Sequence, residues 1–391
     1  MYLNFLRICC LAILVVACNG PSTQSTQSPA TGIGFYYWKT KLKFDKEDKA
    51  LADSLGVKKL YLRYFDVDWS PSRGMAVPVS ELSRDYGYET GSDLAPNKMM
   101  LAEYQLIPVV FITNTVFKNE QNPDSLAVRM ARKIAGISEG IAHAIYPGYG
   151  SYYDSAEEKD DRDWELADSL ANLDRQAFLN KNKEIQIDCD WTPSTRDAYF
   201  TFLKKLQVVL PQHQFTCTVR LHQFRDREQA GIPPVQSATL MCYNVAPPTE
   251  LKTANAIFDP ALVEGYLKEK AYPLPLEVAL PLFSWGALYH EDLFRGLAGG
   301  LTEKEVKNNP LFKAAGERRY QFTQDTVFTG VYMREGDMVR LDGPSQADLQ
   351  RIAEKLSGIE AVKSISFFDW NPSNIYQYDL SGIVAQAAKN H

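Results

Sequence analysis

Two aspartates separated by one residue, Asp188 and Asp190, form the pattern in this chain best suited to acid–base chemistry. They end an apolar run, Glu184 to Trp191, which is typical of a buried strand. Side chains two apart on a strand share a face, so the two carboxylates point the same way and Cys189 points toward the covering helices. Two carboxylates this close raise the pKa of one of them, which suits proton transfer. The alternative is a structural pair bonded to an arginine, Arg220 or Arg63.

Other chemically capable side chains also follow predicted strands at their carboxyl ends. We expect Asp369 to join Asp188 and Asp190 as a catalytic carboxylate. Carboxylates, amides, cations and large aromatic rings together suit a carbohydrate groove better than a phosphate site. The predicted substrate-binding residues are Tyr37, Trp38, Arg63, Asp66, Asn114, Trp191, Arg220, His222, Tyr243, Asn244, Trp285 and Trp370.

Eight apolar strand patterns, most of them followed by amphipathic runs, must position these residues. A (β/α)8 TIM barrel fits this order, and its active site lies at the carboxyl ends of the strands. An open doubly wound sheet is the alternative, but no glycine-rich phosphate loop follows the first strand. The predicted strands are 34–39, 59–66, 106–113, 184–191, 215–222, 238–244, 276–283 and 364–370.

An insertion at about 286–344 follows the seventh strand. Residues 331–340 within it read as a small hairpin that turns at Glu335-Gly336-Asp337. Long loops in compact domains are often functional.

The fourth strand resembles the D-x-x-D-x-D-x-E motif of glycoside hydrolase family 18, a family of (β/α)8 barrels. Asp188 and Asp190 match its second and third acidic positions. Ile185 replaces the first, and Thr192 replaces the glutamate that serves the family as general acid. The resemblance therefore implies a degenerate site, in which another carboxylate protonates the leaving oxygen or hydrolysis is lost.

Two further short motifs carry the same resemblance. Met241-Cys242-Tyr243-Asn244 matches the M-x-Y-[DN] of the family's sixth strand, and Trp370 takes the place of the tryptophan that floors its sugar subsite. The insertion after the seventh strand is also typical of the family. The chain is similar as well to envelope lipoproteins of Bacteroidetes-type bacteria, a group without an assigned reaction.

Three functions follow from these residues. The first is a glycoside hydrolase acting on an extracytoplasmic glycan, and the second is a non-catalytic glycan-binding protein with a degenerate chitinase-like site. The number of acidic residues at the strand ends favours the enzyme. The third is metal-assisted hydrolysis with Asp188, Asp190 and His222 as ligands, but His222 is the only histidine at a strand end, so we expect no metal and no cofactor.

The first residues predict export and a lipid anchor. Arg7, the short apolar run Ile8 to Ala17 and the small residue before Cys18 form a signal peptide over 1–17 that resembles a bacterial lipobox. An ordinary signal peptide with a chance cysteine is the alternative. Residues 18–32 then form a lipidated Cys18 and a flexible Ser/Thr/Gln-rich tether. We expect a membrane-anchored lipoprotein of the bacterial cell envelope whose barrel domain spans 33–391.

Composition narrows the partners. The 391 residues carry a net charge of -6 and no basic tract, which excludes nucleic acid as an expected partner. Cys189, Cys217 and Cys242 form no CxxC pair and fall in predicted strands, so we expect small buried side chains instead of metal ligands or disulfides. The expected partner is a glycan or oligosaccharide, bound by a monomer.

Overall fold

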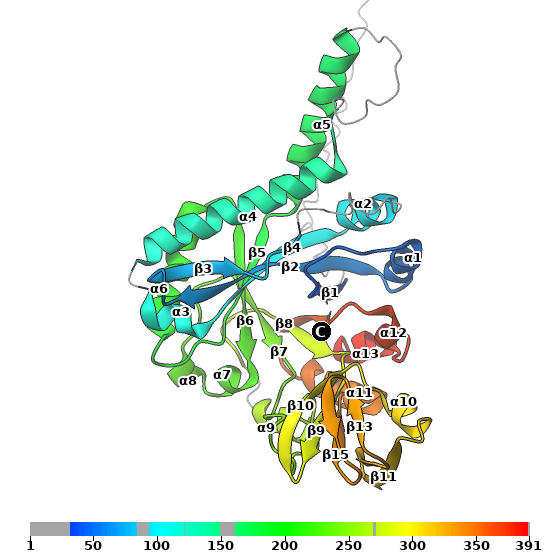
Figure 1. The fold of residues 1–391 in the computed structure, drawn as a ribbon. Helices are drawn as coiled ribbons and strands as arrows, with labels where there is room; N and C mark the ends of the chain where they lie inside the picture. The colour runs from blue at the N-terminus through cyan, green and yellow to red at the C-terminus, as the bar shows by residue number, and fades with distance from the viewer. Residues whose placement is uncertain (1–31, 84–93, 121, 149–160, 269–270, 390–391) are drawn as a thin grey trace, which may run out of the picture. The chain divides into compact units, whose positions relative to one another are not determined.

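Eight parallel strands close into a barrel in the computed structural model, which confirms the predicted fold class (Figure 1). The strands pair in the order β1-β16-β8-β7-β6-β5-β4-β2, and β2 pairs back with β1. The strands are β1 (Ile33–Tyr37), β2 (Val57–Ser70), β4 (Gln105–Ile112), β5 (Glu184–Asp188), β6 (Gln214–Arg220), β7 (Ser237–Met241), β8 (Leu276–Pro281) and β16 (Val362–Phe368).

The structure describes residues 32–83, 94–120, 122–148, 161–268 and 271–389. The predicted signal peptide, Cys18 and all but the last residue of the predicted tether lie outside these residues. Among the helices that the structure describes, none is long and apolar enough to cross a membrane.

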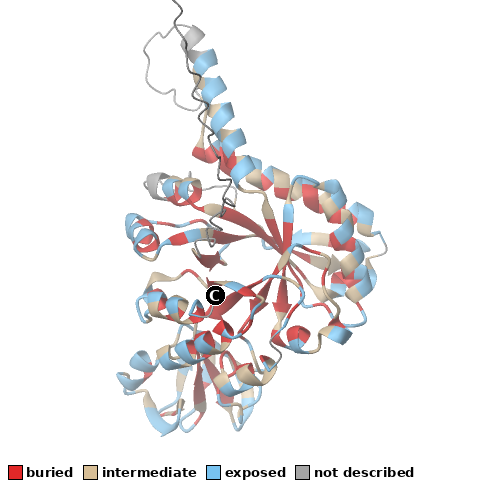
Figure 2. Ribbon diagram, turned by 180° about the vertical axis from the view of Figure 1, so that it is seen from behind, coloured by how far each residue is buried: buried red, intermediate tan, exposed pale blue. Residues whose placement is uncertain are grey.

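Most helices cover the outside of the barrel with buried inner faces and exposed outer faces, whereas α5 extends away from it and is exposed along most of its length (Figure 2). Side-chain caps define where several begin: Asp45 and Asp48 form a capping box at α1, and Ser345 and Asp348 form another at α11. The helices are α1 (Lys46–Ser54), α2 (Leu94–Glu103), α3 (Asn114–Asn119), α4 (Pro123–Ile145), α5 (Asp161–Lys181), α6 (Arg196–Val209), α7 (Leu221–Arg225), α8 (Arg227–Ala230), α9 (Pro260–Tyr266), α11 (Gln346–Ser357), α12 (Pro372–Ile375) and α13 (Leu380–Ala387).

A polar layer crosses the barrel interior. The Tyr36 hydroxyl donates to Gln186 Oε1 (2.7 Å), and Gln186 Nε2 donates to Thr239 Oγ1 (2.9 Å). The rings of Tyr36 and Tyr61 stack with centroids 4.4 Å apart. Because side chains alternate along a strand, Tyr36 faces inward while its neighbour Phe35 packs against Phe367 outside. This layer separates the two ends of the barrel interior.

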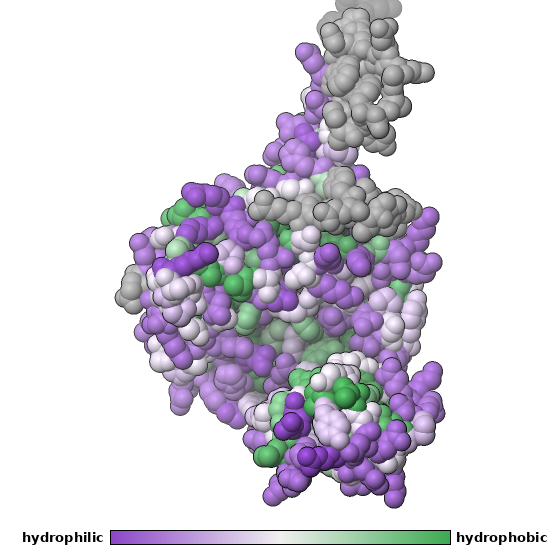
Figure 3. Space-filling view, viewed as in Figure 1, coloured by the Kyte–Doolittle hydropathy of each residue, from purple (hydrophilic) through white to green (hydrophobic). Residues whose placement is uncertain are grey.

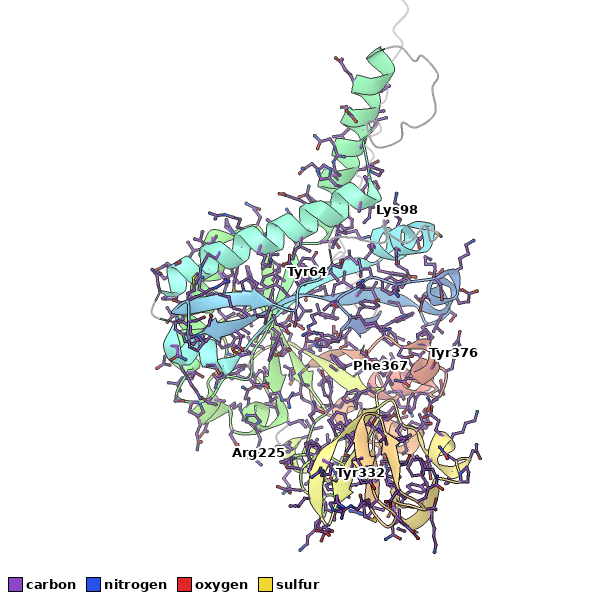
Figure 4. All side chains as sticks on the ribbon, viewed as in Figure 1. Tyr64, Lys98, Arg225, Tyr332, Phe367 and Tyr376 are labelled. Carbon is purple, nitrogen blue, oxygen red and sulfur yellow. The ribbon has the colours of Figure 1, made fainter. Side chains whose placement is uncertain are left out.

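The insertion after β8 forms a five-stranded antiparallel sheet in the order β10-β9-β15-β12-β11 and a two-stranded sheet of β13 and β14. The insertion has its own hydrophobic core, which includes Leu288, Tyr320 and Val339. Figure 4 labels Tyr332 within the insertion. The elements are β9 (Trp285–His290), β10 (Leu293–Gly299), α10 (Glu303–Lys307), β11 (Phe312–Gly316), β12 (Arg319–Phe322), β13 (Thr326–Phe328), β14 (Val331–Met333) and β15 (Met338–Asp342).

The predicted hairpin over residues 331–340 is wrong. The turn and both strands exist, but β14 pairs with β13 while β15 pairs with β9 and β12. Each strand finds its partner elsewhere in the insertion, which a local turn signal cannot indicate. Another strand, β3 (Met75–Val79), pairs antiparallel with the end of β2 and occupies part of the long connection to β4.

The three cysteines of the barrel are free and buried, as predicted. Burial raises the pKa of the Tyr199 hydroxyl on α6, and the nearby Cys217 and Cys189 raise it further, which places Cys189 on the helix side of the barrel. Asp188, the preceding residue and the last of β5, therefore points toward the barrel interior.

Candidate active site

Aromatic rings form a continuous wall at the carboxyl ends of β1, β16, β7 and β8. Phe368 lies at its centre, with ring centroids 5.5 Å from Trp38, 5.2 Å from Tyr243 and 5.7 Å from Phe283. Trp285 extends the wall, 5.5 Å from Phe283. All but Tyr243 are partly exposed, so part of each side chain is accessible to a ligand. Such rings offer large apolar contact area at a small cost in conformational entropy.

Asp188 is one of two buried carboxyl groups described at this end of the barrel, the other being Asp66. Its side chain accepts a hydrogen bond from Thr218 Oγ1 on β6 at 2.6 Å. The pKa of Asp188 is raised to about 6, mainly by burial; the charges of Asp190 and Asp66 contribute to the increase, while the Thr218 bond and Arg220 oppose it. A carboxyl group with this pKa changes protonation near the pH of ordinary enzyme catalysis.

Asp190 lies two residues further along and is much more exposed. Its Oδ1 is 3.5 Å from Arg220 Nε, and its side chain is 53% exposed. The predicted pair is therefore asymmetric: Asp188 is shielded from water, and Asp190 is open to a substrate and balanced by a cation. Environments that differ in this way separate the roles of two carboxyl groups.

Arg63 and Asp66 form a second ion pair at this end of the barrel. Arg63 Nε donates to Asp66 Oδ1 at 2.8 Å, and a second, shorter bond joins Arg63 Nη2 to Asp66 Oδ2. The guanidinium carbon of Arg63 lies 5.2 Å from the centroid of Trp38, a cation–π distance. Because Asp66 fixes Arg63, the pair also fixes Trp38 in the aromatic wall.

Thr192 occupies the position where the family resemblance would place a glutamate, and Asn114 lies beside it. Asn114 Oδ1 accepts from Thr195 Oγ1 at 2.5 Å, and Asn114 Nδ2 lies 3.4 Å from Thr192 Oγ1. Thr192 also shares a hydrogen bond with Ser194 at 2.9 Å. Hydroxyl and amide groups therefore surround Thr192. Among the described residues, no carboxylate forms a hydrogen bond with Thr192 or Asn114.

His222 and Asn244 are both exposed beyond the ends of β6 and β7. Although the residue is exposed as a whole, partial desolvation of its ring and the nearby Arg220 lower the pKa of His222 against the charges of Asp190 and Asp226, so the ring is mainly neutral at pH 7. Asn244 adopts a left-handed backbone conformation (φ 55°), which asparagine tolerates better than most residues. Both side chains remain available to a ligand at the edge of the site.

Three predicted binding residues, Tyr37, Trp191 and Trp370, lie outside the barrel interior and are almost fully buried, so the prediction is corrected for them. Trp370 Nε1 donates to Asp48 Oδ1 on α1 at 2.7 Å, and Trp191 Nε1 donates to the Ala230 carbonyl at 2.9 Å. The Tyr37 hydroxyl bonds to backbone groups of the following loop. These side chains hold helices and loops against the barrel and cannot stack on a sugar.

Asp369 follows β16 beside Lys39. Burial raises the pKa of Asp369, and the Lys39 charge lowers it. Its charge also reaches Tyr37, on the outer side of β1. The charges that shift the pKa of Asp188 come instead from Asp190, Arg220 and Asp66. Asp369 therefore interacts with charged and polar groups of β1 and the loop after it, whereas Asp188 interacts with groups on or next to β2, β5 and β6.

The insertion fixes Trp285 through a buried ion pair. Trp285 Nε1 donates to Asp342 Oδ2 at 2.9 Å, and Arg340 bonds to both Asp342 oxygens at 2.8 and 2.9 Å. The side chains of Arg340 and Asp342 are 0% exposed. Arg340 also donates to the carbonyls of Glu250 and Pro248 in the loop after β7. One network therefore joins the insertion, this loop and the aromatic wall.

In the part of the chain that the structure describes, Asp188, Asp190 and His222 do not come together as a group of three His, Cys, Asp or Glu side chains that could hold a metal ion.

No family model and no curated protein matches the chain. Among solved structures, the spore cortex-lytic enzyme SleL of Bacillus cereus is 12% identical with a TM-score of 0.44, over 91% of this chain and 74% of that chain. A xylanase-α-amylase inhibitor protein, XAIP-III, is 9% identical with a TM-score of 0.40, over 91% and 98%. EndoBT-3987 of Bacteroides thetaiotamicron, solved with Man5GlcNAc product, is 9% identical with a TM-score of 0.36, over 93% and 61%. At these values the similarity is distant and carries no argument about function, which depends on the site itself.

Proposed function

We propose that the chain is an envelope lipoprotein whose barrel binds and hydrolyses a glycan at the carboxyl ends of its strands. The observation that carries the proposal is Asp188, a buried carboxyl group with a pKa of about 6 at the end of β5, with the exposed Asp190 two residues further along the chain. The aromatic wall around Phe368 supplies flat apolar surfaces for sugar rings. In the space-filling view, apolar residues gather in a recess beside the insertion, within a mainly polar face (Figure 3).

Glycoside hydrolysis needs a proton on the leaving oxygen and negative charge near the positive sugar that develops. We assign the proton to Asp188, because burial keeps part of its population protonated at mildly acidic pH. We assign the negative charge to Asp190, which is exposed and balanced by Arg220. Arg63 and Asp66 hold Trp38 as a stacking surface.

A glycan screen at two pH values tests this proposal. We expect cleavage of at least one oligosaccharide, faster at pH 5 than at pH 8, because Asp188 loses its proton as the pH rises through about 6. Product release is measured by chromatography of labelled oligosaccharides. A rate that rises steadily from pH 5 to pH 8 would exclude Asp188 as the proton donor.

A glycan-binding protein without turnover is the second candidate, and one observation favours it. Thr192 replaces the family's general acid and its hydroxyl bonds to Ser194 and Thr195, so no proton donor stands there. Binding of an oligosaccharide with no cleavage at pH 5 or pH 8 would select this candidate. Absence of both binding and cleavage across the screen would contradict both.

We further propose that the barrel is tethered to a membrane through lipid on Cys18. The predicted tether leads into β1, which enters the barrel at the end opposite the candidate site. The site would then face away from the membrane, toward an extracytoplasmic polymer. Cys18→Ala is expected to move the protein from the membrane fraction to the soluble fraction on cell fractionation, whereas Cys189→Ala should leave it in the membrane. Equal membrane content of Cys18→Ala and the unmodified sequence would disprove the anchor.

A further inference from the structure

A polar cavity separate from the candidate active site lies at the amino-terminal ends of the barrel strands, on the opposite side of the Tyr36–Gln186–Thr239 layer. Its volume is about 160 Å³, and its lining comes from β2, β5, β6, β7, β8 and β16 with the segments next to them. Its charged side chains are Glu184, Glu277, Lys59 and Lys363. The candidate active site uses none of them.

Glu277 has one bonded and one unbonded carboxylate oxygen. Its Oε2 accepts from Ser364 Oγ at 2.9 Å and lies 3.4 Å from Lys59 Nζ. Its Oε1 is buried and makes no hydrogen bond of normal geometry among the described residues, and the side chain is only 9% exposed. The Tyr61 hydroxyl also lines the cavity, and burial and then the nearby Glu277 carboxylate raise its pKa. Gly34 faces this oxygen: a Cβ there would lie 3.1 Å from Oε1. The absence of that Cβ leaves space at the unbonded oxygen.

Negative charge exceeds positive charge inside this cavity. Glu184 faces it as a second carboxylate, with only a 3.4 Å bond from Thr216 Oγ1. Lys59 is the cation between the two glutamates, and both raise its pKa against the effect of burial. Lys363 also lines the cavity, but it is exposed and donates to the Glu360 carbonyl, so water screens its charge more than that of the buried groups. One lysine therefore balances two carboxylates, and an unbalanced buried charge is costly.

We infer that this cavity is a binding site for a small monovalent cation, Na⁺ or K⁺, held by Glu277 Oε1 and Glu184. Carboxylate and hydroxyl oxygens are the donors that hard cations prefer. A single positive charge neutralises the excess, whereas a divalent ion would reverse it. The volume accommodates one ion with a few waters, since each water takes about 30 Å³. Polar groups at this end of a barrel serve stability, so the ion would stabilise the fold.

Thermal unfolding of the purified protein at pH 8 tests the site. We expect a Tm about 2–4 °C higher in NaCl or KCl than in N-methyl-D-glucamine chloride of equal ionic strength. Glu277→Gln should abolish this difference. Glu264→Gln, which removes an exposed carboxylate paired with Arg351, should retain it. An equal Tm in all three salts would overturn the inference, and so would a difference in Tm that remains in Glu277→Gln. Either result would show that water or a proton on Glu184, and not a cation, compensates the buried carboxylates.

Crystals grown in RbCl provide the second measurement and need no variant, which matters if Glu277→Gln does not fold. The expected result is an anomalous peak at Glu277 Oε1. No peak there would exclude K⁺, and no peak together with an equal Tm in NaCl and N-methyl-D-glucamine chloride would overturn the inference. A peak without any dependence of Tm on Na⁺ or K⁺ would mean binding at crystal concentration only, and would also overturn it.

Discussion

Asp188→Asn is expected to reduce glycan cleavage by about 10²–10⁴-fold and, at pH 8, to increase the free energy of unfolding. The first effect follows because asparagine cannot carry the proton. The second follows because burial raises the pKa of Asp188 from 3.8 to about 6, so ionising it in the folded protein costs about 3 kcal/mol. Asparagine avoids this cost, and its amide oxygen can still accept the bond from Thr218.

The gain in stability should depend on pH with a defined sign. Between about pH 4 and pH 6 the folded protein binds more protons at Asp188 than the unfolded chain, so this group's contribution to stability falls as the pH rises. The advantage of Asp188→Asn should therefore be near zero below pH 4 and reach its full size, about 1–3 kcal/mol, above pH 6.

Urea unfolding at several pH values, beside cleavage assays, measures both effects. Asp190→Asn is the matched control: its carboxylate is 53% exposed, so we expect no comparable gain in stability. Undiminished cleavage by Asp188→Asn would remove this residue from the mechanism. A loss of stability at pH 8 would contradict the account of its environment.

Arg340→Met is expected to lower the free energy of unfolding by about 3–5 kcal/mol, because it leaves the Asp342 carboxylate buried without its cation. Trp285 would lose its fixed hydrogen-bond partner, so glycan affinity should fall as well. Urea unfolding and calorimetric titration with the oligosaccharide measure the two effects.

Arg351→Met is the control for Arg340→Met. The Arg351–Glu264 pair is exposed (55% and 32%), so its loss should cost less than about 1 kcal/mol and leave affinity unchanged. Similar losses of stability for the two variants would contradict the structural role that we assign to the buried pair.

The alternation of side chains along β5 was sufficient to predict the placement of Asp188. Its inward direction follows from a two-residue period within a strand. The sequence-based expectation of a raised pKa rested on the closeness of the two carboxylates, whereas burial is the main cause and the Asp190 charge is a smaller one. The order of the eight strands was predictable for a similar reason: apolar runs bounded by amphipathic helices leave few arrangements other than a barrel.

The two-residue alternation no longer predicts the direction of a side chain beyond the end of a strand. The predicted fourth strand continued to Trp191, but β5 ends at Asp188, and the following turn sends the Trp191 ring among the helices. Trp370 lies two residues beyond the end of β16 and likewise turns outward, to Asp48. The sequence did not indicate Phe368, at the centre of the aromatic wall. A phenylalanine within an apolar run can face either the barrel interior or the surrounding helices, and its residue type does not distinguish the two.

Glycan binding by Trp38→Ala measures the central claim most directly, because Trp38 belongs to the wall in both the catalytic and the non-catalytic candidate. With Asp188→Asn as background to prevent turnover, the oligosaccharide found in the screen should bind at least about tenfold more weakly after Trp38→Ala. Trp370→Phe in the same background should lower the Tm but keep the dissociation constant, because Trp370 faces α1. An unchanged dissociation constant for Trp38→Ala, or a loss of binding only with Trp370→Phe, would contradict the proposed site.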